Sequence, residues 1–222
     1  MKISLVSSVG GLGAAVFAAA LALAAPMTAL ANGLDSLAAF IQNAKNGRAD
    51  FTQTVTSPPA ADGASRVRKS SGQFDFQRPG QFRFDYRKPF EQIIVADGKT
   101  LWYYDVELNQ ITERQQTQAL AQTPAALIAS ASNLKALEAE FTLAAVPDRD
   151  GLQWVKATPK TPGGQLKEVE IGFNGDKLAA LEILDAFGQR SVLRFSRVEV
   201  NVGLPAGIFQ FKVPAGVDVL RQ

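Results

Sequence analysis

The chain of 222 residues contains no cysteine and no histidine. Without cysteine, it can form no disulfide and cannot carry lipid on an amino-terminal cysteine. Without histidine, it can assemble neither a Ser-His-Asp nor a Cys-His catalytic arrangement, and the absence of both residues argues against a zinc site. An enzyme with this sequence would have to use carboxylates, lysine, tyrosine or serine alone, so the composition favours a protein that is not an enzyme and holds no metal or cofactor.

The chain also lacks a large excess of positive or negative charge. The chain has 23 Lys and Arg against 21 Asp and Glu, a net charge of +2, with no cluster of like charge. This balance argues against nucleic acid as a partner.

Long hydrophobic stretches are confined to the amino terminus. Lys2 precedes a segment rich in Ala, Leu and Val, and Pro26 is followed by the small-x-small sequence Ala29-Leu30-Ala31. This pattern predicts a secretory signal peptide over residues 1–31, with cleavage before Asn32. A permanent membrane anchor is the alternative, but the glycines in the segment and the cleavage site disfavour it. Residues 32–222 are therefore expected to form one exported domain.

The most informative stretch runs from Gly72 to Asp105. Large apolar side chains alternate with polar ones, which is the period of a half-buried strand. Arg78-Pro79-Gly80 and Lys88-Pro89 interrupt the alternation, and Asp97-Gly98 is a tight-hairpin signature. The stretch predicts four antiparallel strands with an aromatic face, formed by Phe74, Phe76, Phe82, Phe84 and Tyr86.

Helical patterns are few. Apolar residues at helical spacing predict an amphipathic helix over residues 34–45, including Leu37 and Ile41. One or two short helices are expected in the alanine-rich segment 115–131, and another over 133–138. Strands are expected at 49–56, 107–113, 141–146, 152–158, 166–173, 178–184, 191–200 and 209–213. This order predicts about ten or eleven mostly antiparallel strands in a barrel or a strongly curved sheet.

The side chains of this sheet allow more than one interpretation. A phenylalanine-rich face is most often ordinary core, and a binding cavity is the alternative. Arg78 either shares that face, where its guanidinium needs several acceptors, or points to solvent at the bulge beside Pro79. Four carboxylates could suggest a catalytic pair, but turns and solvated strand edges explain Asp97, Asp105, Glu107 and Glu113 more simply. Trp102 and Trp154 are expected in the core.

Several short motifs stand in a distinctive order along residues 32–222. They are Phe51–Gln53, Gly72–Phe76, Arg78–Phe84, Asp97–Trp102, Tyr104–Asp105, Thr123–Pro124, Asp185–Gln189 and Pro214–Asp218. Taken in this order, they resemble the LolA family of periplasmic outer-membrane lipoprotein carriers. The resemblance covers essentially the whole of residues 32–222, and the pairing of Arg-Pro-Gly-x-Phe with Asp-Gly-Lys-Thr-Leu-Trp is its most specific part.

The resemblance implies an unclosed antiparallel β-barrel of about eleven strands, with an α-helical lid of about three short helices over an apolar cavity. It implies a periplasmic monomer that takes triacylated lipoproteins from an inner-membrane LolCDE-type ABC transporter. The protein would then deliver them to a LolB-type outer-membrane acceptor.

The resemblance also implies roles for individual residues. Arg78 matches an arginine that bonds from inside the barrel to backbone groups of the lid. Phe82 matches an apolar position tied to cargo handling, so the acyl-chain cavity is expected at Phe74, Phe76, Phe82, Phe84 and Tyr86. The lid helices are expected to close through Leu37, Ile41, Leu127 and Ile128.

Two other functions are compatible with the same fold, because fold does not determine function. One is a module that senses or binds lipids or acylated proteins without transporting them. The other is an enzyme that acts on an apolar ligand, which the missing histidine and cysteine disfavour. The absence of cysteine, which rules out lipid on an amino-terminal cysteine, also argues against this chain being the LolB-type acceptor itself.

Overall fold

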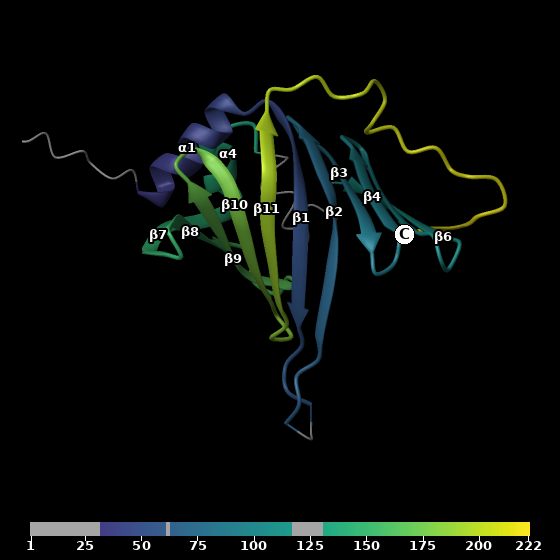
Figure 1. Ribbon diagram of the computed structural model, residues 1–222, viewed down its shortest axis with the longest axis horizontal. Helices are drawn as coiled ribbons and strands as arrows, with labels where there is room; N and C mark the ends of the chain where they lie inside the picture. The colour runs from purple at the N-terminus through teal and green to yellow at the C-terminus, as the bar shows by residue number, and fades with distance from the viewer. Residues whose placement is uncertain (1–31, 61–62, 117–130) are drawn as a thin grey trace, which may run out of the picture. The chain divides into compact units, whose positions relative to one another are not determined.

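The structure is a computed structural model that describes residues 32–60, 63–116 and 131–222. Ala31–Gln222 form one compact unit, built mainly of β-strands (Figure 1). Its first half contains α1 (Gly33–Asn43), β1 (Asn46–Thr56), β2 (Val67–Gln77), β3 (Gln81–Lys88), β4 (Gln92–Asp97), β5 (Thr100–Asp105) and β6 (Gln110–Gln115). Its second half contains α4 (Leu134–Glu140), β7 (Phe141–Arg149), β8 (Leu152–Pro159), β9 (Leu166–Asn174), β10 (Lys177–Asp185), β11 (Arg190–Val200) and β12 (Asp218–Arg221).

The strands form a single sheet in the order β12-β6-β5-β4-β3-β2-β1-β11-β10-β9-β8-β7. Every neighbouring pair is antiparallel except β12 with β6, and β12 and β7 are not paired with each other. The mainly β class and the unclosed sheet predicted from the sequence are therefore confirmed, with 12 strands in the described part of the chain. Two helices lie in the described residues. The helices expected within 115–131 fall largely on residues 117–130, which are outside the described part of the chain.

The aromatic alternation produces the inner face of the sheet. Phe74 pairs with Phe84, and Phe76 pairs with Phe82, across β2 and β3. These four side chains are 0–4% exposed, whereas the polar residues between them lie on the opposite, outer face. The period-2 pattern therefore identified the buried face correctly, because successive side chains of a strand point to opposite sides.

Helix α1 begins at a complete capping box. The Asn32 side chain accepts hydrogen bonds from the backbone N–H groups of Leu34 and Asp35, and the Asp35 carboxylate accepts one from Asn32 N. The apolar side of α1 contacts β7, β8, β9 and β10, and it also contacts α4. The helix therefore covers the inner face of one half of the sheet and leaves the inner face of β4 to β6 without this cover.

The contacts of one α1 side chain, Phe40, show that the sheet is strongly curved. The Phe40 ring centroid lies 5.8 Å from the centroid of Phe76 on β2 and 5.8 Å from that of Phe173 on β9. Strands β1, β11 and β10 separate β2 from β9 in the sheet. The sheet must therefore curl around α1 for both rings to reach it.

The close packing of β2 depends on a glycine. A Cβ atom added to Gly72 would overlap the backbone carbonyl of Asp85 on β3 and would approach the Phe51 ring to 3.0 Å. Gly72→Ala is therefore expected to lower the free energy of unfolding by about 2–3 kcal/mol, because an overpacked core forces backbone shifts. Urea denaturation measures this change.

Gly203→Ala is the matched control, since no atom lies within 4 Å of its added Cβ. We expect it to change the free energy of unfolding by less than about 0.5 kcal/mol. Equal effects of the two substitutions would contradict the close-packing argument.

The final strand predicted from the sequence is wrong. Residues 209–213 form no strand, and the chain instead pairs Asp218–Arg221 with β6. Phe209 is buried, and the Phe211 ring stacks on Trp102 at a centroid distance of 5.4 Å. The apolar residues of this segment therefore cover the outer face of the sheet by side-chain packing, without joining its hydrogen-bond ladder.

No helix of the described residues has the length and apolar character needed to cross a membrane.

Candidate functional site

The inner face of β2 and β3 is a continuous aromatic cluster. The ring centroids of Phe74 and Phe84 are 4.4 Å apart, and those of Phe82 and Phe84 are 6.2 Å apart. Phe51 on β1 joins the cluster at 5.3 Å from Phe84 and 5.0 Å from Tyr86. Phe51 was not predicted as a cavity residue, although its alternation along β1 carries the signal that would have found it. The residues proposed to contact acyl chains are thus packed on one another.

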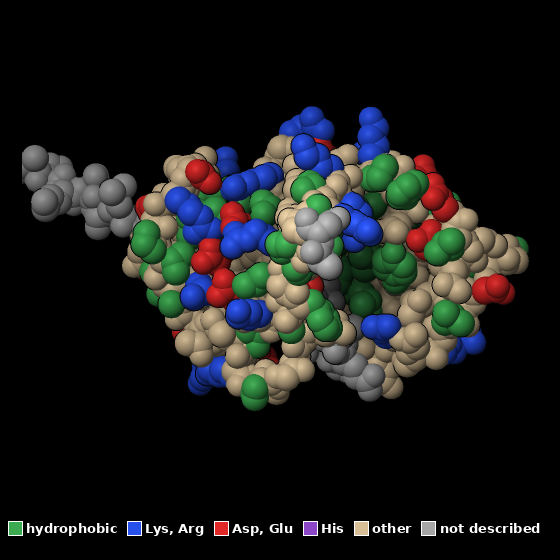
Figure 2. Space-filling view, turned by 90° about the horizontal axis from the view of Figure 1, so that it is seen from below, with side chains coloured by type: hydrophobic (Ala, Val, Ile, Leu, Met, Phe, Trp, Pro, Cys, Tyr) green, Lys and Arg blue, Asp and Glu red, His purple; other side chains and the backbone are tan. Residues whose placement is uncertain are grey.

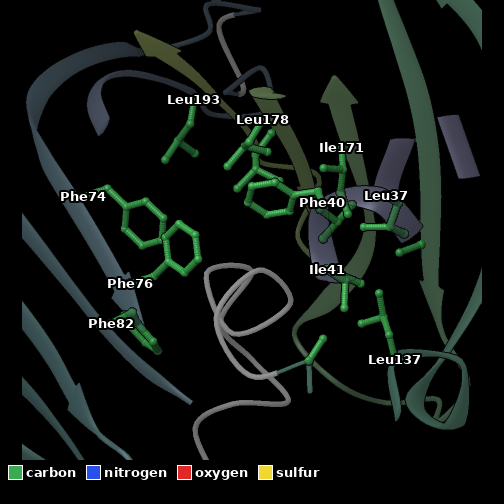
Figure 3. Close-up of a cluster of buried hydrophobic side chains, with 14 of the residues drawn as sticks. Leu37, Phe40, Ile41, Phe74, Phe76, Phe82, Leu137, Ile171, Leu178 and Leu193 are labelled. Carbon is green, nitrogen blue, oxygen red and sulfur yellow. The ribbon is translucent and has the colours of Figure 1, made fainter. Parts of the chain in front are cut away.

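The two lid residues predicted on α1 lie in the same core. Leu37 and Ile41 are each 3% exposed. Figure 3 shows Phe40 of α1 between these residues and the rings of Phe74 and Phe76 on the opposite wall. Leu127 and Ile128 lie outside the described residues, so their contacts stay a prediction.

Arg78 joins the end of β2 to the end of α1. Its Nε donates a hydrogen bond to the carbonyl oxygen of Ala44, the C-cap residue of α1, at 2.9 Å. Its Nη1 donates to the carbonyl oxygen of Ala131 at 3.2 Å. Carbonyls at the carboxyl end of a helix lack intrahelical partners and carry partial negative charge, so a guanidinium suits them. Of the two orientations left open by the sequence, Arg78 adopts the inner one.

The surroundings of Arg78 are largely apolar. Its guanidinium carbon lies 5.3 Å from the ring centroid of Phe40 and 5.4 Å from that of Phe76, which is within cation–π range. Burial lowers the pKa of the Arg78 guanidinium from 12.5 to about 10. The side chain therefore stays charged at neutral pH while α1 and β2 both contact it.

Gln116 holds the turn that follows Arg78. This side chain is 2% exposed, and its Nε2 donates to the Gly80 carbonyl at 2.6 Å. Its Oε1 accepts a hydrogen bond from Gly98 N at 2.8 Å, so one amide connects the β2–β3 turn to the β4–β5 turn. Nothing in the sequence distinguished Gln116 from the neighbouring glutamines, because both of its partners are backbone groups of distant turns.

An open hollow of about 400 Å³ lies where α1 does not cover the sheet. It is lined by Ile94, Leu101, Tyr103, Thr112 and Arg114, from strands β4, β5 and β6. Leu101 also packs against the main core. Figure 2 views the protein from the lower end of Figure 1 and shows hydrophobic side chains within the hollowed region. None of these lining residues was predicted as a cavity residue. The open space and the aromatic cluster share no residue, and they are adjacent parts of the inner face.

A chain of hydrogen-bonded polar groups crosses the inner face at the Tyr86 end of the aromatic cluster. The Tyr86 hydroxyl donates to Gln53 Oε1 at 2.9 Å, and Gln53 Nε2 donates to the Ser191 hydroxyl at 2.7 Å. Burial, with a smaller contribution from Tyr103, raises the pKa of the Tyr86 phenol to about 12. The phenol is therefore a neutral hydrogen-bond donor at physiological pH, and the apolar interior ends at this polar belt.

Three of the four carboxylates considered for catalysis have structural partners of their own. Asp97 Oδ1 accepts the backbone N–H groups of Lys99 and Thr100 at the hairpin, and Asp105 accepts Leu108 N and Gln92 Nε2. Glu113 pairs with Arg221. Across residues 32–60, 63–116 and 131–222, no group of three or more His, Cys, Asp or Glu is placed to hold a metal ion. These carboxylates serve turns and strand edges.

The two tryptophans occupy the outer face. Trp154 is fully buried, its Nε1 donates to the Arg149 carbonyl at 3.0 Å, and the Arg149 guanidinium carbon lies 3.8 Å from its ring centroid. Trp102 is half-buried and stacks on Phe211. Neither contributes to the hollow.

Comparison with known proteins matches this chain to one family. The family model described as "Outer membrane lipoprotein carrier protein LolA" matches residues 42–212. An outer-membrane lipoprotein carrier protein from Albidiferax ferrireducens is 62% identical over 86% of this chain and 92% of its own length. One from Leptothrix cholodnii is 54% identical over 87% of this chain and 88% of its own. A solved LolA superfamily protein from Nitrosomonas europaea aligns at 13% identity with a TM-score of 0.44, covering 82% of this chain and 99% of that one.

Proposed function

We infer the function from the family: this chain belongs to the LolA family of outer membrane lipoprotein carrier proteins. We propose that it is a periplasmic chaperone, exported by a signal peptide in residues 1–31, that shields the acyl chains of triacylated lipoproteins. It takes them from an inner-membrane LolCDE-type ABC transporter and delivers them to a LolB-type acceptor in the outer membrane. It acts as a monomer and without a catalytic step.

The observation that carries this proposal is the partly covered apolar inner face. Helix α1 fills one half of it, while β4 to β6 leave an open hollow of about 400 Å³ beside the aromatic cluster. Ligand pockets of about 300–1,000 Å³ hold one drug-sized molecule, so the hollow receives part of a triacylated anchor. The remaining chains require α1 to move away from the aromatic cluster.

The energy of acyl-chain burial explains why such a movement is needed. Each buried methylene contributes about 0.8 kcal/mol, so three complete chains would exceed the practical limit of noncovalent affinity, about 18–21 kcal/mol. A cargo held that tightly could not be passed on. We propose that breaking the contacts of Arg78 with Ala44 and Ala131 offsets part of this energy in the loaded protein.

Purification from periplasm, followed by mass spectrometry, tests the proposed function. We expect acylated lipoproteins to accompany the protein when an acceptor is depleted, because the cargo then has no exit. A periplasmic protein of similar size with the same affinity tag is the control. Recovery of the chain alone under these conditions would favour a different function of the fold, such as lipid sensing.

A further inference from the structure

Three of the turns at the lower end of the sheet in Figure 1 lie near one another. Thr56 of β1 pairs with both Val67 of β2 and Arg190 of β11, so the β1–β2 loop and the β10–β11 turn share this end. Lys88 pairs with Ser71, which brings the β3–β4 turn to the same end. A Cβ added to Gly188 would lie 3.3 Å from the Pro58 side chain, so the first two of these turns are in contact. We call the exposed residues of these turns and the adjoining strand ends the rim.

Cations from two separate segments gather at the rim. They are Arg66, Arg68, Lys69, Arg87 and Lys88, all exposed. None of the five forms a salt bridge within the described residues, and Arg87 donates to the neutral side chain of Gln73. Glu91 is the acidic residue of segments 63–69 and 87–91. Although the sequence showed no cluster of like charge, the pairing of β2 with β3 creates one.

Several cations on the outer face of the sheet are neutralised. On β7 to β9, Arg149 pairs with Glu170, and Lys156 pairs with Glu168. Arg194 pairs with Asp150. The rim therefore differs from these outer-face positions, because its positive charges stay available to an external anion. Figure 2 shows Lys and Arg side chains beside the β1–β2 loop and the hollow.

Large apolar side chains stand among these cations. Val67, Phe90 and Phe187 are 57%, 55% and 75% exposed, and the two phenylalanines occupy turns. Apolar side chains at separate turn tips suit a flat partner into which each inserts, whereas a protein groove would favour one continuous stripe. Amphipathic surfaces that bind a bilayer combine such residues with Lys and Arg that face anionic headgroups.

We propose that the rim binds the surface of an anionic phospholipid bilayer, with Phe90 and Phe187 entering the headgroup region and the five cations facing lipid phosphates. The membrane surface would then lie at the end of the protein from which Figure 2 looks into the hollow. This inference goes beyond the proposed function and does not rest on it, because it requires only the cargo-free protein and a lipid surface.

Vesicle sedimentation tests the inference, using purified protein that comprises residues 32–222. We expect binding to vesicles of phosphatidylglycerol mixed with phosphatidylcholine and none to phosphatidylcholine alone. Each cation near an anionic surface raises binding about fivefold, so the triple variant Arg68→Gln, Lys69→Gln, Lys88→Gln should bind about 100-fold more weakly. The double variant Phe90→Ser, Phe187→Ser should lose about tenfold or more.

A second triple variant provides the matched control. Lys135→Gln, Lys177→Gln and Lys212→Gln remove the same charge from exposed positions on α4, at the start of β10 and in the carboxyl-terminal segment. We expect its binding to stay within about threefold of the unmodified protein, because the effect of charge on binding falls off within a Debye length of the surface. Circular dichroism confirms that each variant is folded.

Two results would overturn the inference. One is the absence of binding to phosphatidylglycerol vesicles at low salt, which would leave an acidic protein as the candidate partner for the rim. The other is an equal loss of vesicle binding in the rim and control triple variants. That result would mean that the net charge of the protein, and not the position of the cations at the rim, causes the attraction.

Discussion

Arg78→Leu is expected to leave lipoprotein loading intact and to slow transfer to the acceptor about 100-fold. The substitution removes charged hydrogen bonds to the carbonyl oxygens of Ala44 and Ala131, each of which contributes about 1.5–3 kcal/mol. The closed, empty state then loses about 3 kcal/mol relative to the open, loaded state. Release of cargo, which ends in the closed state, becomes correspondingly less favourable.

A transfer assay measures this effect. The variant is loaded with an acylated lipoprotein, and the amount passed to an acceptor is followed over time. Arg83→Leu is the matched control, because Arg83 lies on the outer face of β3 and pairs with Asp85. We expect the control to transfer normally and Arg78→Lys to be intermediate, since an ammonium cannot reproduce the geometry of a guanidinium. Transfer by Arg78→Leu at the unmodified rate would exclude a role for the Arg78 contacts in cargo release.

Phe82→Glu is expected to abolish lipoprotein loading. Phe82 is 0% exposed and packs within the aromatic cluster next to Phe84. A carboxylate at this position would be buried among phenylalanine rings, and the nearby Arg78 guanidinium already donates to the carbonyls of Ala44 and Ala131. Burying such a charge is strongly unfavourable. The free energy of unfolding should fall by about 3–5 kcal/mol. Phe82→Leu is the control, which we expect to load cargo at a stability cost below about 1.5 kcal/mol.

A second substitution separates loss of loading from loss of folding. Leu101 lines the open hollow and is only half-buried, so Leu101→Glu places a charge in the proposed path of an acyl chain without burying it completely. We expect this variant to retain its unfolding transition and to lose at least tenfold in loading, measured by recovery of acylated lipoprotein. Normal loading by folded Leu101→Glu would place the cargo elsewhere.

Sequence reasoning succeeded where a pattern is local. Alternation along β2 and β3 identified the buried face, and the Asp97-Gly98 signature located a hairpin that the structure contains. The amphipathic spacing over 34–45 predicted α1 to within two residues of its observed bounds. These features depend on contacts between residues that are near one another in the chain, so composition and period describe them well.

The same reasoning failed where the structure depends on which segments, far apart in the sequence, pair or pack together. The alternation at 209–213 resembles a strand, yet these residues pack side chains on β5 while Asp218–Arg221 pair with β6. The hollow was missed for a related reason. Leu101 and Tyr103 are ordinary strand residues in the sequence, and they line an open space only because α1 packs over the other half of the sheet.

The sequence by itself determined which side chains share a face of each strand, and it left open whether Arg78 shares the aromatic face. The alternation of successive side chains is a property of the single strand, so it needs no partner to be read. Only the tertiary structure decided that Arg78 reaches the end of α1, that α1 leaves the inner face of β4 to β6 uncovered, and that Lys69 and Lys88 lie at one rim. Strand order and register bring these groups together across long separations, and local patterns do not specify such pairings.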